Sequence, residues 1–284
     1  MATRSGKGGG KQSPPANLWL ARQLHALAQY LSSYTASLRN RPTVERPYAR
    51  IFVDGLDGPT YLDWRDASRG AKAARRLLFP DLARDETQLL LSGVADVAAE
   101  VTPRFDRHVA LSRRGAAAGV LGICDEDWTV QRALLFLDPV AAQIEWPTIA
   151  AVARTRAIDL WLLVPMGLGL DRLLAGTTST PEPWRRRVDA LLGSESWLED
   201  FHRTSHARTP LDDSDRAVKA AKKAIGRPLV ERLKSTFAAT ADEARVVRDA
   251  RGHPLYLVGF AVGSTGGART ALRLSSYLLA QWGA

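Results

Sequence analysis

The sequence predicts a doubly wound α/β fold with a mainly parallel sheet, and two observations support this prediction. Short apolar runs alternate with segments of helical spacing through most of the chain, and two late apolar runs flank Arg251-Gly252-His253-Pro254. Alternating strands and helices are typical of a parallel sheet, whereas Gly and Pro between two apolar runs indicate an antiparallel hairpin. We therefore expect a seven-stranded sheet in which a C-terminal hairpin supplies the antiparallel strand.

One long amphipathic helix is expected near the N-terminus, over residues 17–39. Its apolar positions recur at three- and four-residue spacing, as Leu20, Leu24, Leu27, Leu31, Tyr34 and Leu38. This stripe is expected to dock on the chain's own sheet rather than in a coiled coil, because it lasts only about three heptads. Residues 1–16 are rich in Gly, Lys and Pro, and we expect them to form a basic tail without fixed structure.

The remaining elements follow from apolar runs and their spacing. The expected strands are residues 48–53, 88–91, 108–111, 133–137, 158–164, 244–248 and 255–262. A helix is expected over residues 147–156, with Pro147 at its start, and a closing helix over residues 267–282. The chain then divides into a sheet domain over 17–179, a helical cap or insertion over 180–240, and a segment over 241–284 that completes the sheet.

Composition favours a soluble cytoplasmic protein. The chain has 284 residues and 45% hydrophobic content, which is sufficient for a large core. It contains no run of eighteen apolar residues, and its N-terminus has no apolar segment typical of a signal peptide. The single cysteine, Cys124, excludes an intramolecular disulfide and a cysteine-cluster metal site. We expect no metal and no membrane contact, and the oligomeric state stays open.

The charge balance favours an acidic partner or reflects an arginine-rich proteome. Lys and Arg number 39 against 30 Asp and Glu, which gives a net charge of +9. Much of the excess lies in residues 1–16 and 201–234. The candidate nucleic-acid contacts are Arg185, Arg186, Arg187, Lys219, Lys222 and Lys223. Trp184 and Trp197 lie among them and could stack on bases, although a tryptophan on a helix is more often part of the core.

Two strand ends carry the candidate site. In doubly wound sheets, ligands bind at the carboxyl ends of strands, near the point where the strand order reverses. Residues 54–60 begin directly after a strand and resemble a glycine-rich loop that a nucleoside cofactor approaches closely. Its candidate contacts are Asp54, Gly55, Asp57, Gly58 and Pro59. Asp138 and Pro139 end a second strand, where Asp138 could also cap the helix that follows.

Residues 133–174 resemble the three-Cys-motif partner protein family, TcmP. Members of this family carry a similar block, which stands here as Phe136-Leu137-Asp138-Pro139, Glu145-Trp146, Thr148-Ile149, Asp159-Leu160-Trp161, Pro165-Met166-Gly167-Leu168-Gly169 and Arg172-Leu173-Leu174. The resemblance implies a Rossmann-like fold similar to class I S-adenosylmethionine-dependent methyltransferases. It also implies S-adenosylmethionine as a cofactor and a radical S-adenosylmethionine enzyme as a partner.

The resemblance also suggests a role for Asp138 and Pro139. They resemble the Asp-Pro-Pro-aromatic motif with which amino-directed methyltransferases hold a target nitrogen while an aromatic ring stacks on the flipped base. Val140 stands here where that ring is common, so stacking would pass to Trp146 or Trp161. The catalytic candidates are therefore Asp138, Pro139 and Trp146.

Three positions depart from the family pattern and keep a second hypothesis open. Asp57 stands where alanine is usual, no acid follows residues 88–91, and Arg113-Arg114 stand where Gly-Asp is common. The leading hypothesis is a methyltransferase-related protein that acts with a partner enzyme on nucleic acid or another acidic substrate. The alternative is a non-catalytic nucleic-acid-binding or scaffold protein, a pseudoenzyme with an eroded pocket. A metal-dependent nuclease built on Asp54, Asp57 and Asp138 is a third.

Overall fold

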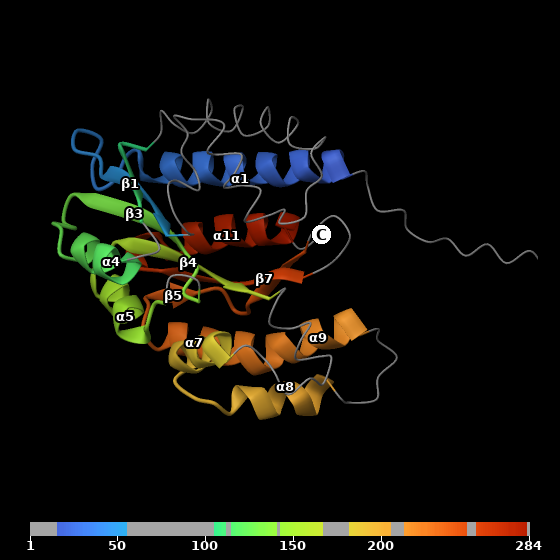
Figure 1. The fold of residues 1–284 in the computed structure, drawn as a ribbon. Helices are drawn as coiled ribbons and strands as arrows, with labels where there is room; N and C mark the ends of the chain where they lie inside the picture. Colours follow the sequence, from blue (N-terminus) through green and yellow to red (C-terminus); the bar gives the residue numbers. More distant parts are fainter. Residues whose placement is uncertain are drawn as a thin grey trace, which may run out of the picture.

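The structure, a computed structural model, describes residues 16–55, 105–111, 115–140, 143–166, 182–205, 213–248 and 254–282. Within these ranges the fold is mixed α/β, with one sheet between two layers of helices (Figure 1). The prediction of a mixed α/β fold is therefore confirmed. The predicted strand over 88–91 lies outside the described residues.

Seven strands form the described sheet. They are β1 (Ala49–Gly55), β2 (Arg107–Ala110), β3 (Gln131–Leu137), β4 (Ile158–Pro165), β5 (Ala239–Thr240), β6 (Arg245–Arg248) and β7 (Pro254–Val262). Their order is β2-β1-β3-β4-β7-β5, and β6 also pairs with β7. The three neighbouring pairs among β2, β1, β3 and β4 are parallel, whereas β7 is antiparallel to β4, β5 and β6. A mostly parallel sheet with one antiparallel strand is thus confirmed, although β5 was not predicted.

The strand order reverses between β1 and β3. From β1 the chain goes to β2 on one side, then returns past β1 to β3 on the other side and continues outward to β4. Such a reversal leaves a crevice at the carboxyl ends of the two strands, because the connections from them diverge. Asp54 and Gly55 are the last residues of β1, and Asp138 directly follows β3. The candidate site predicted from the sequence therefore lies at the reversal point.

One face of the sheet is covered by two helices, α1 (Ala16–Leu38) and α11 (Ala268–Trp282), which lie side by side above it in Figure 1. Beneath them runs an aromatic row across four neighbouring strands, formed by Phe52, Phe136, Trp161 and Phe260. The α1 residues Leu27, Leu31 and Tyr34 are buried in the same cluster. The predicted docking of the N-terminal helix on its own sheet is therefore confirmed for these residues.

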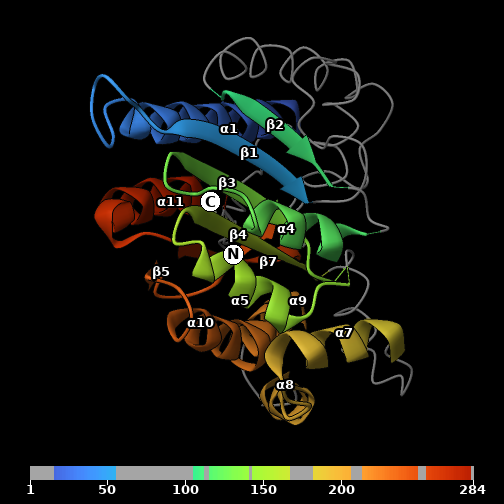
Figure 2. The same cartoon turned by 90° about the vertical axis from the view of Figure 1, so that its left-hand side faces the viewer.

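The opposite face carries the other helices (Figure 2). They are α4 (Ala116–Cys124), α5 (Trp146–Arg154), α7 (Glu182–Leu192), α8 (Trp197–Ser205), α9 (Asp213–Ala221), the π-helix η2 (Lys222–Gly226) and α10 (Arg227–Lys234). Val188, Phe201 and Leu229 from these helices join one hydrophobic cluster with Leu135 and Leu162 of the sheet. The predicted cap thus shares the core of the sheet. Among the described helices, none has the length and apolar character needed to span a bilayer.

Candidate functional site

The carboxyl ends of β1 and β3 bring Asp54 and Asp138 to neighbouring strands. Asp54 pairs in register with Phe136, and Gly55 pairs with Leu137. One step further, the main-chain amide of Asp138 donates to the carbonyl oxygen of Gly55 over 3.4 Å. Both acidic side chains are buried, with 1% and 7% of their surface exposed. The two predicted acids therefore flank the reversal point of the sheet.

A local turn fixes the carboxylate of Asp138. Its Oδ1 accepts a hydrogen bond from the amide of Val140 over 3.0 Å, two residues along the chain. The α5 helix begins only at Trp146, and its N-cap residue is Glu145, which makes no side-chain cap. The expectation that Asp138 caps the following helix is therefore wrong, because its carboxylate closes an Asx-type turn well before that helix begins.

Gly55 is explained by the packing of its own strand. A Cβ atom at this position would lie 2.8 Å from both the Cδ1 of Leu137 and the carbonyl oxygen of Phe136. Only glycine fits this approach, so Gly55 by itself does not indicate a cofactor. Asp57, Gly58 and Pro59, the other predicted cofactor contacts, lie outside the described residues. In the described part of the loop, Asp54 is the acid of the predicted set, and 1% of its surface is exposed.

The two tryptophans predicted to stack on a base have structural contacts. Trp146 lies under the guanidinium of Arg232, whose Cζ is 4.2 Å from the ring centroid. Arg232 also donates from Nη1 to the carbonyl of Leu191 over 2.7 Å, so it joins α5, α7 and α10. Trp161 is fully buried, and its Nε1 donates to the hydroxyl of Tyr30 over 2.9 Å. A stacking role for Trp161 is wrong, because its ring has no exposed surface.

The three predicted arginines of α7 have different surroundings. Arg185 pairs with Glu195 over 3.2 Å, and Arg186 is exposed. Arg187 donates from Nη1 to the carbonyl of Val140 over 3.1 Å. Arg187 therefore holds the same turn that Asp138 closes, and it links α7 to the candidate site. No local sequence pattern indicates this contact, because the two residues are 47 positions apart.

The predicted lysines line a hollow of about 690 Å³ between α9, η2, α10 and the segment before β6. Its basic residues are Lys219, Lys222, Lys223 and Arg227, and its acidic residues are Asp215, Glu231, Asp242 and Glu243. The Nζ of Lys222 lies 3.3 Å from Glu243 Oε2. Equal numbers of basic and acidic side chains therefore meet here, which weakens the field available to a polyanion.

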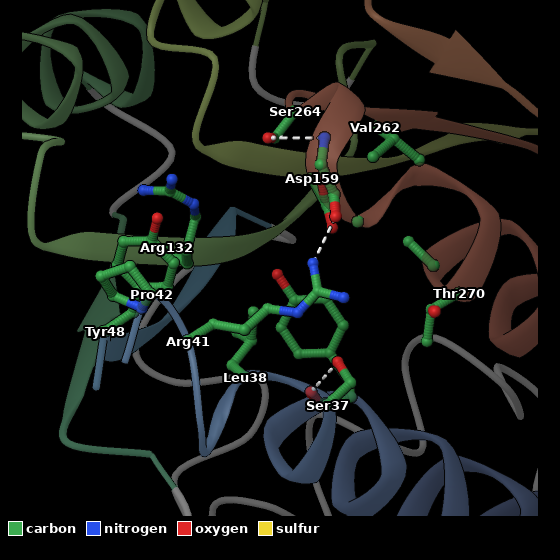
Figure 3. A pocket seen from close by; sticks show the side chains of 14 residues that line it. Ser37, Leu38, Arg41, Pro42, Tyr48, Arg132, Asp159, Val262, Ser264 and Thr270 are labelled. Atoms are coloured by element: carbon green, nitrogen blue, oxygen red, sulfur yellow. Dashed lines mark hydrogen bonds between the residues drawn. The ribbon is translucent and has the colours of Figure 1, made fainter. Parts of the chain in front are cut away.

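A pocket that the sequence did not predict lies at the opposite, amino end of the parallel strands. We call it the amino-edge pocket; it has a volume of about 310 Å³ (Figure 3). It is lined by Tyr34, Ser37, Leu38, Arg41, Pro42, Tyr48, Arg132, Asp159, Val262, Ser264, Gly266, Gly267, Thr270 and Ala271. These residues come from α1, the segment after it, β3, β4, the end of β7, η3 (Thr265–Gly267) and α11.

Asp159 is the buried acid of this pocket. Its Oδ1 accepts a hydrogen bond from the amide of Gly263 over 3.0 Å, and 9% of its surface is exposed. Burial raises the pKa of Asp159 from 3.8 to about 7, although the Gly263 amide, Tyr34 and Arg132 act in the opposite direction. The sequence analysis did not predict this acid. The pattern that could have indicated it is a single Asp within the apolar run over 158–164.

Two further observations bear on the site hypotheses. Within the described ranges, no three or more His, Cys, Asp or Glu side chains are grouped as metal ligands, and Asp57 of the nuclease hypothesis lies outside those ranges. The chain was also compared with protein-family models, curated proteins and solved structures. None of the three comparisons gave a significant match, so the likeness to the TcmP family rests on the motifs quoted above.

Proposed function

We propose that the chain is a Rossmann-like, methyltransferase-related protein of the TcmP type, with its site in the crevice between the carboxyl ends of β1 and β3. The observation that carries this proposal is the placement of two buried acids, Asp54 and Asp138, on either side of the reversal point. Ligands of doubly wound sheets bind at this place. The partner would be a radical S-adenosylmethionine enzyme, and the substrate a nucleic acid or another acidic molecule.

The position of β7 supports the same proposal. Class I methyltransferases have parallel strands followed by an antiparallel hairpin at the C-terminus. Here β7, the last strand among the described residues, lies between the parallel strand β4 and the strands β5 and β6. Agreement of this kind favours the fold and leaves the activity to be tested, because one fold supports many functions.

The two acids would have different roles. S-adenosylmethionine, when bound, supplies an electrophilic methyl group. Asp54 would accept hydrogen bonds from the cofactor side of the crevice. The Oδ1 of Asp138 is held by Val140, and Arg187 holds the same turn, so the carboxylate has a fixed direction. A fixed carboxylate can orient an acceptor N–H or O–H group and receive its proton.

Calorimetric titration of the full chain with S-adenosylmethionine and with its demethylated product tests the proposal. We expect micromolar dissociation constants, and an Asp54→Asn variant should weaken binding about tenfold. Asp138→Asn should leave cofactor affinity nearly unchanged and abolish methyl transfer in the presence of the partner enzyme. Asp125→Asn, an exposed change at the end of α4, is the matched control. Absence of binding at millimolar ligand would overturn the proposal.

A non-catalytic nucleic-acid-binding or scaffold protein is the second candidate. Two predicted site residues favour it, because the Gly55 position is explained by packing and one face of Trp146 is occupied by Arg232. Fluorescence anisotropy with labelled single-stranded RNA and DNA tests it. The affinity should fall steeply as the salt concentration rises. A double variant with Lys219→Gln and Lys223→Gln should reduce the slope of log affinity against log salt concentration by about two. Lys234→Gln, which does not line that hollow, is the control; an unchanged slope contradicts this candidate.

A further inference from the structure

The amino-edge pocket lies at the opposite end of the parallel strands from the proposed methyl-transfer site. Arg132 stands at the start of β3, whereas Asp138 follows its end. Because β7 is antiparallel, its last residue Val262 reaches the same amino edge, as does Ser264, two positions later. The pocket therefore has walls of its own, and its occupant would be a different molecule from the one that the carboxyl edge binds.

Two guanidinium groups reach this pocket from different elements. The Nη1 of Arg41 donates to the carbonyl of Gly266, and the Nη1 of Arg132 donates to the carbonyl of Trp128 over 3.0 Å. The Arg132 guanidinium also lies over Tyr48, with its Cζ 3.7 Å from the ring centroid. A guanidinium carries five N–H donors; these contacts hold Arg41 through one nitrogen and Arg132 through one nitrogen and a ring. Both groups are therefore positioned before any ligand binds.

The opposing wall of the pocket also favours an anion. Gly266, Gly267 and Thr270 lie where η3 leads into α11, a helix of 15 residues whose dipole is positive at this end, although the amide of Ala268 already donates to the carbonyl of Thr265. The Oγ of Ser264 accepts from the amide of Gly266 over 3.3 Å and fixes this turn. Arg41, Arg132 and the start of α11 thus line one cavity (Figure 3).

The size and the remaining walls restrict the ligand. A volume of about 310 Å³ is at the lower end of the range for small-molecule pockets and excludes a folded macromolecule. Leu38, Pro42, Val262 and Ala271 add an apolar surface beside the charged groups. An anionic group attached to a small organic body would use both kinds of wall, whereas an inorganic ion would use only one.

We propose that the amino-edge pocket binds a small organic phosphate, whose phosphate group is held by Arg41, Arg132 and the first turn of α11. Guanidinium groups match phosphate oxygens in geometry, and a helix N-terminus favours the same charge. The carboxyl of Asp159 also lines the pocket, and in its protonated form it can donate a hydrogen bond to the ligand.

Titration calorimetry of the full chain with adenosine 5′-monophosphate, inorganic phosphate and adenosine tests this proposal. The nucleotide should bind saturably and about tenfold more tightly than inorganic phosphate, because only the nucleotide reaches the apolar wall. Arg132→Gln and Arg41→Gln should each weaken it about tenfold. Arg39→Gln removes the same charge from an exposed position outside the pocket and should have little effect. The proposal is overturned if adenosine or inorganic phosphate binds as tightly as the nucleotide. It is also overturned if the Arg132→Gln variant binds the nucleotide as tightly as the unaltered chain does.

A second measurement does not depend on the folding of the arginine variants. The titratable and charged groups around Asp159 are Tyr30 and Tyr34 from α1 and Arg132 from β3, with Arg41 across the pocket. Burial raises the pKa of both tyrosines, whereas the pKa of Asp159 is about 7. The inhibition constant of sulfate, whose charge is constant there, should be lower at about pH 6 than at about pH 8 once it is corrected for the nucleotide's own affinity at each pH, because the phosphate of the nucleotide also titrates near pH 6. In Asp159→Asn this pH dependence should disappear. A pH dependence that persists in the variant, or its absence in the unaltered chain, contradicts the proposed placement of the anion.

Discussion

The carboxylate of Asp159 on β4 accepts a hydrogen bond from the main-chain amide of Gly263, which follows the last residue of β7. This contact joins the first residues of β4 to the end of its antiparallel neighbour. The two segments are so close that a Cβ atom on Gly263 would lie 2.5 Å from the carbonyl oxygen of Ile158. A buried acid and an obligatory glycine therefore form one structural unit.

Gly263→Ala should destabilise the protein by about 3 kcal/mol, because the added methyl group forces β4 and the end of β7 apart. Urea denaturation followed by circular dichroism measures the change. Gly266→Ala is the matched control, since its added Cβ would meet its nearest neighbour, the Oγ of Ser264, at 3.7 Å. Equal stability of the two variants would contradict the close approach at Gly263.

Asp159 should make stability depend on pH in a direction opposite to that of most acids. Its pKa is raised to about 7 by burial, whereas the unfolded chain releases the proton near 3.8. Between these values the folded protein binds more protons, so this group's contribution to the free energy of unfolding falls as pH rises. The loss is on the order of 4 kcal/mol and is complete above about pH 7.

The Asp159→Asn variant checks this dependence, because asparagine keeps the acceptor for the Gly263 amide without a charge. We expect the variant to gain stability relative to the unaltered chain as pH rises from about 4 to about 7, with a constant difference beyond. Denaturation curves of both proteins across this range measure the difference. Asp125→Asn serves as the exposed control, and parallel pH profiles for Asp159→Asn would contradict a buried neutral carboxyl.

Tyr30→Phe should destabilise the protein by about 1–3 kcal/mol. The Nε1–H of Trp161 donates to the Tyr30 hydroxyl, and both residues are buried between α1 and the sheet. Removal of the hydroxyl leaves a buried donor without its acceptor. Thermal denaturation measures the loss. Tyr277→Phe removes a hydroxyl from a residue that is 44% exposed and should have little effect; similar melting temperatures for the two variants would speak against this contact.

Trp146→Leu should separate the structural and site roles of this tryptophan. Because its ring lies under Arg232, the variant should lose about 1–3 kcal/mol of stability through lost packing and cation–π attraction. Its affinity for S-adenosylmethionine should stay unchanged. Urea denaturation and calorimetry measure the two properties. Trp128→Leu, a partly buried change beside α4, is the control for general loss of aromatic packing. A variant that keeps its stability but loses ligand affinity would place Trp146 in the site instead.

Periodicity predicted the elements that have strong local patterns. The α1 stripe, the apolar runs of β3 and β4, and the Gly-Pro signal between β6 and β7 each rest on residues close in sequence. The two-residue strand β5 was missed because Ala239 and Thr240 form no pattern of their own, and their pairing depends on β7. Local signals thus predict long elements better than short ones.

The site was predictable only in part, for a related reason. Asp54 and Asp138 were identified because each follows a strand directly, and parallel strands place their ends together. The contact of Arg187 with Val140 and the meeting of Arg41, Arg132 and Asp159 join residues far apart in the chain. Such contacts are decided by tertiary packing, which no local pattern reports. Trp161 is an error of the opposite kind. Its motif suggested a site residue, but the side chain is buried in the core.

The internal position of β7 has a consequence for synthesis of the chain. β7 leaves the ribosome long after β4, yet it covers the hydrogen-bonding edge of β4, whose sequence Ile158-Asp159-Leu160-Trp161-Leu162-Leu163-Val164 is almost wholly apolar. Until residue 262 has emerged, that edge can pair with other chains. A chain that stops before residue 254 should therefore aggregate rather than form a smaller domain, so nascent chains would depend on chaperones until β7 has been translated.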